Sequence, residues 1–199
     1  NDVIKHWSGV RPLYHDGSIK AQKASRDYTI KIDSQDNNSA LINIFGGKMT
    51  TFRQLSEEVT NKVGSILGEK KSPWTSDVHL PGGDFSLNEK TKIVDGLAKK
   101  YDYLDVDYIQ RLFNSYGTRV EYILNNVSSI DDLGLHFGRD LYQIEVDYLM
   151  QEEFALYPED VLERRTKLYL FLDYDKIENL DNYMQKKRRL DSKYSNIYQ

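Results

Sequence analysis

Gly46 and Gly47 separate two stretches of the chain whose apolar side chains follow different periods. Residues 28–33 alternate apolar and polar side chains, and residues 40–45 are mostly apolar, so two strands joined by a turn are predicted there. After the glycines, apolar residues recur at steps of three and four, which predicts an amphipathic helix over residues 51–68. The chain should therefore pass from a β-hairpin to a helix through this glycine pair.

The glycine pair also favours ligand binding. Glycine lets a ligand approach the backbone closely, and the start of a helix offers N–H groups with a partial positive charge. A phosphate, a carboxylate or an electron-rich ring would suit this turn, where Lys48 adds a cation. A Walker A loop is excluded, because Ile42 and Met49 stand where it needs Gly and Ser or Thr. A plain capping turn, with Thr51 and Gln54 as a capping box, stays open.

The composition narrows the class of protein. The 199 residues are 39% apolar and 29% charged, which is typical of a globular chain of one or two domains. The net charge of −4 argues against a nucleic-acid binder. Cysteine is absent, which excludes disulfides and cysteine nucleophiles and fits the reducing cytoplasm. No metal site is expected, because metal-ligand spacing is missing among the histidines, His6, His15, His79 and His136.

A change of composition divides the chain into two parts. Residues 69–86 hold two prolines and two glycines, which mark a linker or a long loop. Beyond Ser86, which can form a capping box with Glu89, the pattern is helical. We therefore predict an α+β protein, with a β-rich domain over residues 1–75 and a mainly helical domain over residues 76–199.

Several helices are predicted in the second part. The apolar pattern indicates a helix from residue 86 to about 98, followed by helices over residues 105–116, 118–126, 139–152, 158–172 and 176–190. Glutamates alternate with apolar residues around Glu145, Glu152 and Glu153, a mixture that predicts a helix on the surface.

Five segments of the chain carry a resemblance to a known family. They are Trp7–Leu13, Ser25–Tyr28, Phe45–Arg53, Leu80–Phe85 and Asp160–Leu168. Each resembles a segment of the FAD-dependent (aerobic, respiratory) glycerol-3-phosphate dehydrogenases. The five occur in the order of that family, and together they span nearly the whole chain. The first three are similar to the end of the family's catalytic domain, and the last two to its C-terminal helical domain.

The resemblance implies oxidation of sn-glycerol 3-phosphate to dihydroxyacetone phosphate, with hydride transfer to FAD and reoxidation of the flavin by a membrane quinone. The dinucleotide fingerprint of the family lies in an N-terminal part that these residues do not include. Because the chain lacks an initiating Met and begins within a motif, we expect it to be part of a longer protein. Alone, it should be inactive and bind FAD weakly.

The resemblance also implies the site residues. Arg11 would lie beside the substrate and the flavin, both binding phosphate and stabilising charge on the C2 oxygen, and Arg26 would clamp the phosphate. Lys48 would act in catalysis. The residues beside the flavin ring would be Gly46, Gly47, Lys48, Met49 and Thr50. From the residues alone, Arg11 as an exposed or paired arginine and Arg26 as a partner of Asp27 stay open.

Partners are expected from two further features. The basic cluster Lys186–Arg189 fits either a peripheral contact with the inner face of the cell membrane or a solvated helix end. The scattered tyrosines favour a core and a homodimer interface over nucleic-acid stacking. Two alternatives stay open: the helical part serves only assembly, or the enzyme is a glycerol-phosphate oxidase that uses oxygen.

Overall fold

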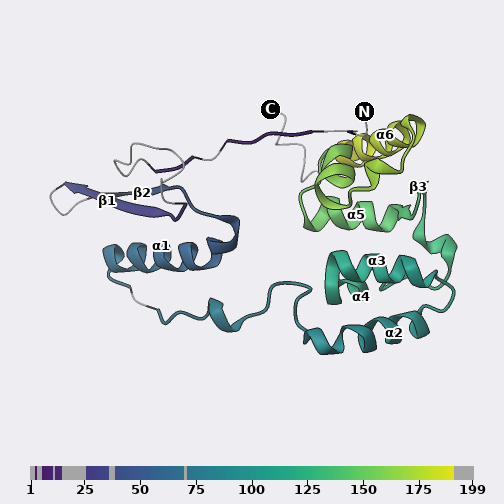
Figure 1. The fold of residues 1–199 in the computed structure, drawn as a ribbon, viewed down its shortest axis with the longest axis horizontal. Coiled ribbons are helices and arrows are strands. Elements are labelled where there is room, and N and C mark those ends of the chain that lie inside the picture. Colours follow the sequence, from purple (N-terminus) through teal and green to yellow (C-terminus); the bar gives the residue numbers. More distant parts are fainter. Residues whose placement is uncertain are drawn as a thin grey trace. The chain divides into compact units, whose positions relative to one another are not determined.

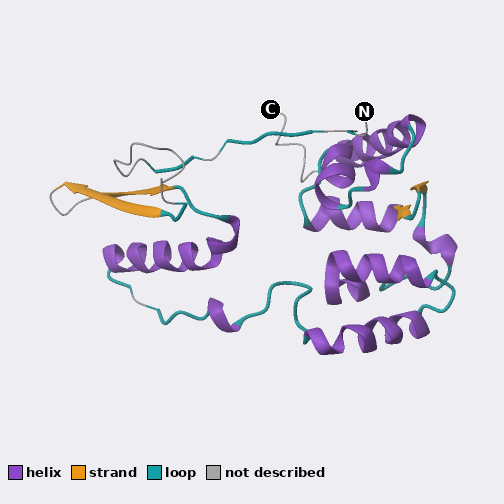
Figure 2. Cartoon of the chain, in the orientation of Figure 1, coloured by secondary structure: helices purple, strands orange, loops and turns teal. Residues whose placement is uncertain are grey.

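The computed structural model describes residues 3, 6–10, 12–14, 26–35, 39–69 and 71–190 (Figure 1). The chain divides into two compact units, Asn1–Val78 and His79–Gln199. Helices predominate, and small two-stranded antiparallel sheets accompany them in the described part (Figure 2). The predicted α+β class is confirmed. Each unit is described below by itself.

The first unit is a β-hairpin followed by a helix. Strand β1 (Thr29–Gln35) pairs antiparallel with β2 (Ser39–Phe45), in a register that sets Thr29 opposite Phe45. A 3-10 turn (Met49–Thr51) leads into α1 (Phe52–Leu67), which lies along the hairpin (Figure 1). The Tyr28 hydroxyl donates to the Glu58 carboxylate at 2.9 Å and joins the two elements. The predicted hairpin and helix are confirmed.

The two ends of α1 differ in how well the sequence predicted them. Gly68 ends the helix in a left-handed conformation, with φ of 77°, and its N–H donates to the Gly64 carbonyl, as glycine at this position favours. The capping box of Thr51 with Gln54 is wrong, because the Thr51 side chain makes no cap hydrogen bond to α1. Its hydroxyl donates to the Lys48 carbonyl at 3.0 Å and accepts from the Lys48 N–H at 3.2 Å. The 3-10 turn before α1 uses this side chain.

The described part of the first unit contains no buried residue. Large apolar side chains of the hairpin and of α1 remain partly in water: Leu41 is 62% exposed, Phe52 48% and Ile44 47%. Burial of such side chains is worth about 1.5–3 kcal/mol each. The hairpin and α1 therefore cover one another only in part.

The second unit is helical and has a dense core. Its α-helices are α2 (Lys90–Lys100), α3 (Val106–Tyr116), α4 (Val120–Ile123), α5 (Gln143–Glu152) and α6 (Tyr174–Leu190). The strands β3 (His136–Gly138) and β4 (Leu141–Tyr142) form a short hairpin before α5. Fully buried side chains from α3, α5 and α6 fill the core, among them Ile109, Leu112, Leu149, Leu180 and Met184.

The helices predicted over residues 86–98, 105–116 and 176–190 are confirmed apart from their ends. The Ser86 N–H donates to the Glu89 carboxylate at 3.2 Å, in the 3-10 turn that precedes α2. The helix over 118–126 is shorter than predicted, because α4 is a single turn. The helix over 139–152 starts later, because its first residues form the β3–β4 hairpin.

The helix predicted over residues 158–172 is wrong as a single element. The chain forms a π-helix (Asp160–Arg165) and then a 3-10 turn (Leu168–Leu170). Lys167 has φ of 62° between them, which no α-helix accommodates. The Thr166 hydroxyl donates back to the Val161 carbonyl at 2.8 Å and closes the wide turn. Side-chain bonding to the backbone has displaced the regular helix here.

The prediction of a surface helix around Glu145 is also wrong. Helix α5 is central, and Glu145, Val146, Leu149 and Met150 are all essentially inaccessible to solvent. A carboxylate is buried only where it is paired and hydrogen-bonded, and Arg111 of α3 supplies that pairing.

Candidate functional site

The turn between β2 and α1 requires its two glycines. Gly46 has φ of 71° and Gly47 has φ of 102°, conformations that other residues rarely adopt. A Cβ atom at position 46 would also lie 3.0 Å from the carbonyl oxygen of Asp27. The segment before β1 therefore lies directly against this turn, and any side chain at position 46 would force them apart.

The strand register brings candidate site residues to one end of the hairpin. Because Thr29 pairs with Phe45, the residues before Thr29 and those after Phe45 leave the sheet together. The Lys48 ammonium donates to the Asp27 carboxylate at 2.8 Å. Arg26, next to Asp27, is exposed at the same end. The structure thus places Arg26 and Asp27 at the same end of the hairpin as Gly46, Gly47 and Lys48.

Residues that follow the glycines form the start of a helical segment. The Lys48 N–H is used by the Thr51 hydroxyl, so it is engaged within the turn. Met49 is 88% exposed and begins the 3-10 turn with Thr50. The N-terminal end of α1 and its preceding turn supply a partial positive charge beside Lys48. An anion or an electron-rich group would be favoured at this end.

Arg11 lies outside the described residues. Its neighbour Pro12 is described, and the Pro12 carbonyl oxygen lies 3.8 Å from the position that a Cβ of Gly46 would occupy. Pro12, which belongs to the motif Trp7–Leu13, therefore lies close to the glycine turn.

The histidines and carboxylates that the structure describes show no metal-ligand geometry. Among the described residues, no group of three or more His, Asp or Glu side chains could hold a metal ion. The ring Nε2 of His136 lies 2.8 Å from the Arg139 carbonyl oxygen, whereas His6 and His79 are exposed, and His15 lies outside the described residues.

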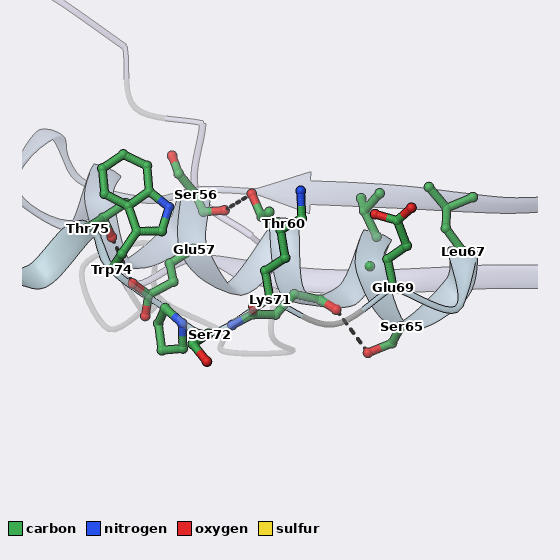
Figure 3. Close-up of a pocket in the computed structure, with 14 residues that line it drawn as sticks. Ser56, Glu57, Thr60, Ser65, Leu67, Glu69, Lys71, Ser72, Trp74 and Thr75 are labelled. Carbon is green, nitrogen blue, oxygen red and sulfur yellow. Dashed lines mark hydrogen bonds between the residues drawn. The ribbon is translucent and has the colours of Figure 1, made fainter.

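A separate cavity of about 670 Å³ lies between α1 and the returning segment 71–75 (Figure 3). Glu57 lies in its wall, where its carboxylate accepts from the Thr75 hydroxyl at 2.7 Å and from the Arg53 guanidinium at 3.1 Å. Trp74 projects at one end and Leu67 at the other (Figure 3). Lys48 does not line this cavity. The Glu57 carboxylate, through its hydrogen bond with Thr75, holds segment 71–75 against α1. We assign the cavity no chemistry.

The second unit contains a buried polar network that the sequence did not predict. The Arg111 guanidinium donates to both carboxylate oxygens of Glu145, at 2.8 and 2.6 Å, and to the Asp140 carboxylate at 2.6 Å. The Tyr116 hydroxyl donates to Glu145 at 2.6 Å. Burial, followed by the charge of Glu145, raises the pKa of Tyr116. An arginine and a glutamate within the apolar stripes of two helices were the available signal.

Of the helices described, none has the length and apolar character needed to cross a bilayer. The basic cluster Lys186–Arg189 lies at the end of α6, where two of its cations contact other side chains and two are exposed. Lys187 pairs with Asp147 at 2.8 Å, and the Arg188 guanidinium lies 4.9 Å from the Tyr157 ring centre. Lys186 and Arg189 are exposed.

Comparison with known proteins identifies the family. The family described as the C-terminal domain of alpha-glycerophosphate oxidase matches residues 73–191, which is more than half of the chain. The chain belongs to this family. The C-terminal domain of alpha-glycerophosphate oxidase corresponds to the helical second unit, whereas the glycine turn lies before the matched residues.

Curated relatives extend the likeness beyond that domain. Glycerol-3-phosphate dehydrogenase of Pseudomonas aeruginosa is 37% identical over 92% of this chain and 36% of its own length. D-erythritol 1-phosphate dehydrogenase of Brucella abortus is 36% identical over 86% of this chain and 34% of its own length. Aerobic glycerol-3-phosphate dehydrogenase of Escherichia coli is 32% identical over 92% and 36%.

These relatives confirm the resemblance seen in the five motifs. The chain spans about a third of the length of the curated relatives that it matches. The activity of a whole enzyme is therefore a matter for proposal.

Proposed function

We propose that this chain is part of an FAD-dependent dehydrogenase that oxidises sn-glycerol 3-phosphate to dihydroxyacetone phosphate. The observation that carries the proposal is the Gly46–Lys48 turn, against which the Arg26–Asp27 segment lies. The cations Lys48 and Arg26 suit a phosphorylated substrate, and the two glycines leave room beside it for a flat ring. The likeness to glycerol-3-phosphate dehydrogenases supports that substrate.

The residues of the turn fit a flavin ring. Gly46 and Gly47 carry no side chain and adopt conformations that expose the backbone. The N–H groups of Gly47, Met49 and Thr50 would hold the edge of the ring, and the partial positive charge of the helical segment favours an anion there. FAD, when bound, supplies the acceptor for the hydride from C2 of the substrate.

The side chains would divide the remaining work. Arg26 would bind the substrate phosphate, since a guanidinium offers a planar fork of donors. Arg11 would hold the C2 oxygen and stabilise the negative charge that develops on it. Lys48 would contact the substrate from the turn and balance its charge.

The incomplete packing of the first unit supports a further expectation. Its partly exposed apolar side chains would be covered by the rest of the FAD-binding domain. We therefore expect residues 1–199 alone to show no turnover and to bind FAD weakly, because the part that binds the ADP half of the cofactor supplies most of the affinity.

The test uses the full-length enzyme loaded with FAD. Arg11→Ala should lower kcat/KM for glycerol 3-phosphate by roughly 10²–10³, the usual loss for a charge-stabilising donor. Arg26→Lys should raise KM, because the ammonium lacks the planar fork. Lys99→Ala, at an exposed position of α2, serves as the matched control. Near-normal turnover of the Arg11 variant would contradict its assignment.

A second candidate substrate is D-erythritol 1-phosphate. The dehydrogenase of Brucella abortus that is named for it is 36% identical to this chain, between the 37% and 32% of the glycerol-3-phosphate dehydrogenases from Pseudomonas aeruginosa and Escherichia coli. Both substrates are polyol phosphates, and the same cations would bind either. Comparing kcat/KM for the two compounds on one enzyme preparation decides between them.

The proposed electron acceptor is a membrane quinone, with oxygen as the alternative. Measuring quinone reduction and hydrogen peroxide formation by the full-length enzyme separates the two. Any membrane contact of α6 would rest on Lys186 and Arg189, since the other two cations of the cluster have partners. Charge reversal at both positions should reduce co-sedimentation with anionic vesicles, and unchanged sedimentation would dismiss this contact.

A further inference from the structure

We propose that Asp27 is a positioning residue that holds Lys48 toward the substrate, an inference that rests on the proposed function. The two residues are 21 positions apart, and the hairpin register brings them together at the end of the sheet. Their ion pair of 2.8 Å spans the glycine turn. Asp27 itself makes no contact with the substrate in this scheme.

The backbone of Asp27 is fixed from two sides. Its carbonyl oxygen lies where only a glycine at position 46 leaves room. The next residue, Tyr28, is tied to Glu58 of α1 by a hydrogen bond of 2.9 Å. The carboxylate therefore starts from an anchored backbone and sits on a short side chain, whereas the Lys48 ammonium sits at the end of a long and flexible one.

The anchored Asp27 carboxylate restricts the positions that the Lys48 ammonium can take. A lysine ammonium is a point charge on a flexible four-carbon stem, with three protons to donate. One proton is used by Asp27, and two remain for the oxygens of an anionic substrate. The ion pair thereby keeps the ammonium at the turn, so the Lys48 side chain loses less conformational entropy when the substrate binds.

A purely structural role for the pair is small by comparison. Lys48 is 45% exposed and Asp27 71% exposed, and exposed ion pairs contribute little to stability. Loss of the Asp27 carboxylate should therefore change substrate binding while leaving the melting temperature unchanged. This separation of the two effects makes the proposal testable.

The experiment uses the full-length, FAD-loaded enzyme with the variants Asp27→Asn, Asp27→Glu, Lys48→Ala and the double variant Asp27→Asn/Lys48→Ala. Asp27→Asn should raise KM for glycerol 3-phosphate about tenfold with little change in kcat, within the range of coupling between contacting residues. Asp27→Glu should restore most of this loss. Calorimetric titration with dihydroxyacetone phosphate should show the same weakening at equilibrium, independently of turnover.

The double variant should be no worse than Lys48→Ala, because Asp27 acts through Lys48. Asp33→Asn is the matched control, since Asp33 is an exposed β1 carboxylate with its own partner, Asn43, at 3.0 Å. Additive losses, or an Asp27→Asn variant that binds like the unaltered enzyme, would overturn the positioning role. Failure of the unaltered enzyme to oxidise glycerol 3-phosphate would instead contradict the proposed function.

Discussion

The two units of this chain differ in how far they stabilise themselves. In the second unit, apolar side chains from α3, α5 and α6 are fully buried, and the buried carboxylate of Glu145 is paired with Arg111. In the first unit, none of the described residues is buried, and polar side-chain contacts such as the Tyr28–Glu58 hydrogen bond help to join the hairpin to α1. We therefore expect the unit that carries the candidate site to depend on a further surface more than the helical unit does.

Hydrogen exchange gives the largest expected contrast between the units. Amides of α3 and α5 should exchange only through global unfolding, and those of β1, β2 and α1 through local opening, which requires far less free energy. We expect protection to differ by several orders of magnitude, measured by mass spectrometry on the chain alone. Equal protection in both units would remove the comparison. Slower exchange of α1 in the full-length enzyme would show that another surface covers it.

The buried charge network offers the next largest effect. Glu145→Gln leaves the Arg111 guanidinium without its full counter-charge inside the core, and breaking such a pair typically costs about 3–5 kcal/mol of unfolding free energy. Urea denaturation of the chain measures the change. Glu121→Gln is the control, because its pair with Lys100 is exposed and should be worth about 1 kcal/mol or less. Similar losses in both variants would argue that Glu145 is not a buried hub.

This network is also a feature that could not be predicted from the sequence. Short-range patterns predicted the β1–β2 hairpin, α1 and most helices, because each depends on the spacing of neighbouring residues. The pairing of Arg111 with Glu145 depends on how two helices pack, and no local pattern encodes it. The same limit affected α5, whose glutamate predicted a surface and lies in the core instead.

The candidate site shows the same division. The glycine turn could be found from sequence, since the need for positive φ is local. The contribution of Asp27 could not, because it arises from the strand register. The π-helix at Asp160–Arg165 escaped prediction for a similar reason, since side-chain bonds to its own backbone replace the regular pattern.

A close contact between Gly82 and Gly117 holds the chain in place near the start of the second unit. Gly117 and Gly82 both have positive φ, and the Thr118 N–H donates to the Gly82 carbonyl at 3.1 Å. A Cβ at position 117 would collide with the Gly82 backbone. Gly117→Ala should therefore destabilise the unit by about 1–3 kcal/mol.

Gly96→Ala is its matched control, because a Cβ at that position in α2 meets no atom within 4 Å. Alanine should stabilise this helix by about 0.5–1 kcal/mol. Thermal unfolding of both variants gives the comparison directly. Opposite signs are expected from the same chemical change, and a loss at both positions would indicate that the Gly82–Gly117 contact has no special role.

The smallest expected effect concerns Asp84, just after that contact. A hydrogen bond from the Thr118 hydroxyl, together with one from its own backbone, lowers the pKa of Asp84 from its usual 3.8. A carboxyl whose pKa is lowered by folding stabilises the protein above its unfolded pKa, and this stability is lost as the pH falls through the folded pKa. The Asp84 contribution should thus be complete at neutral pH, begin to fall as the pH nears the usual value of 3.8, and vanish below the lowered pKa of the folded state.

Asp84→Asn and Thr118→Val should therefore both be less stable than the unaltered chain at pH 7, with a difference that narrows in acid. Asp95→Asn, on the exposed side of α2, should leave the pH profile unchanged. Urea midpoints between pH 3 and 7 measure the three profiles. The hydrogen bond joins Asp84 to the 3-10 turn that precedes α4. A stability difference that stays constant across this pH range would therefore mean that the Gly82–Gly117 contact alone holds residues 82–84 in place. The helical unit would then rely on backbone packing at this contact, in contrast to the charge network of Arg111 and Glu145 in its core.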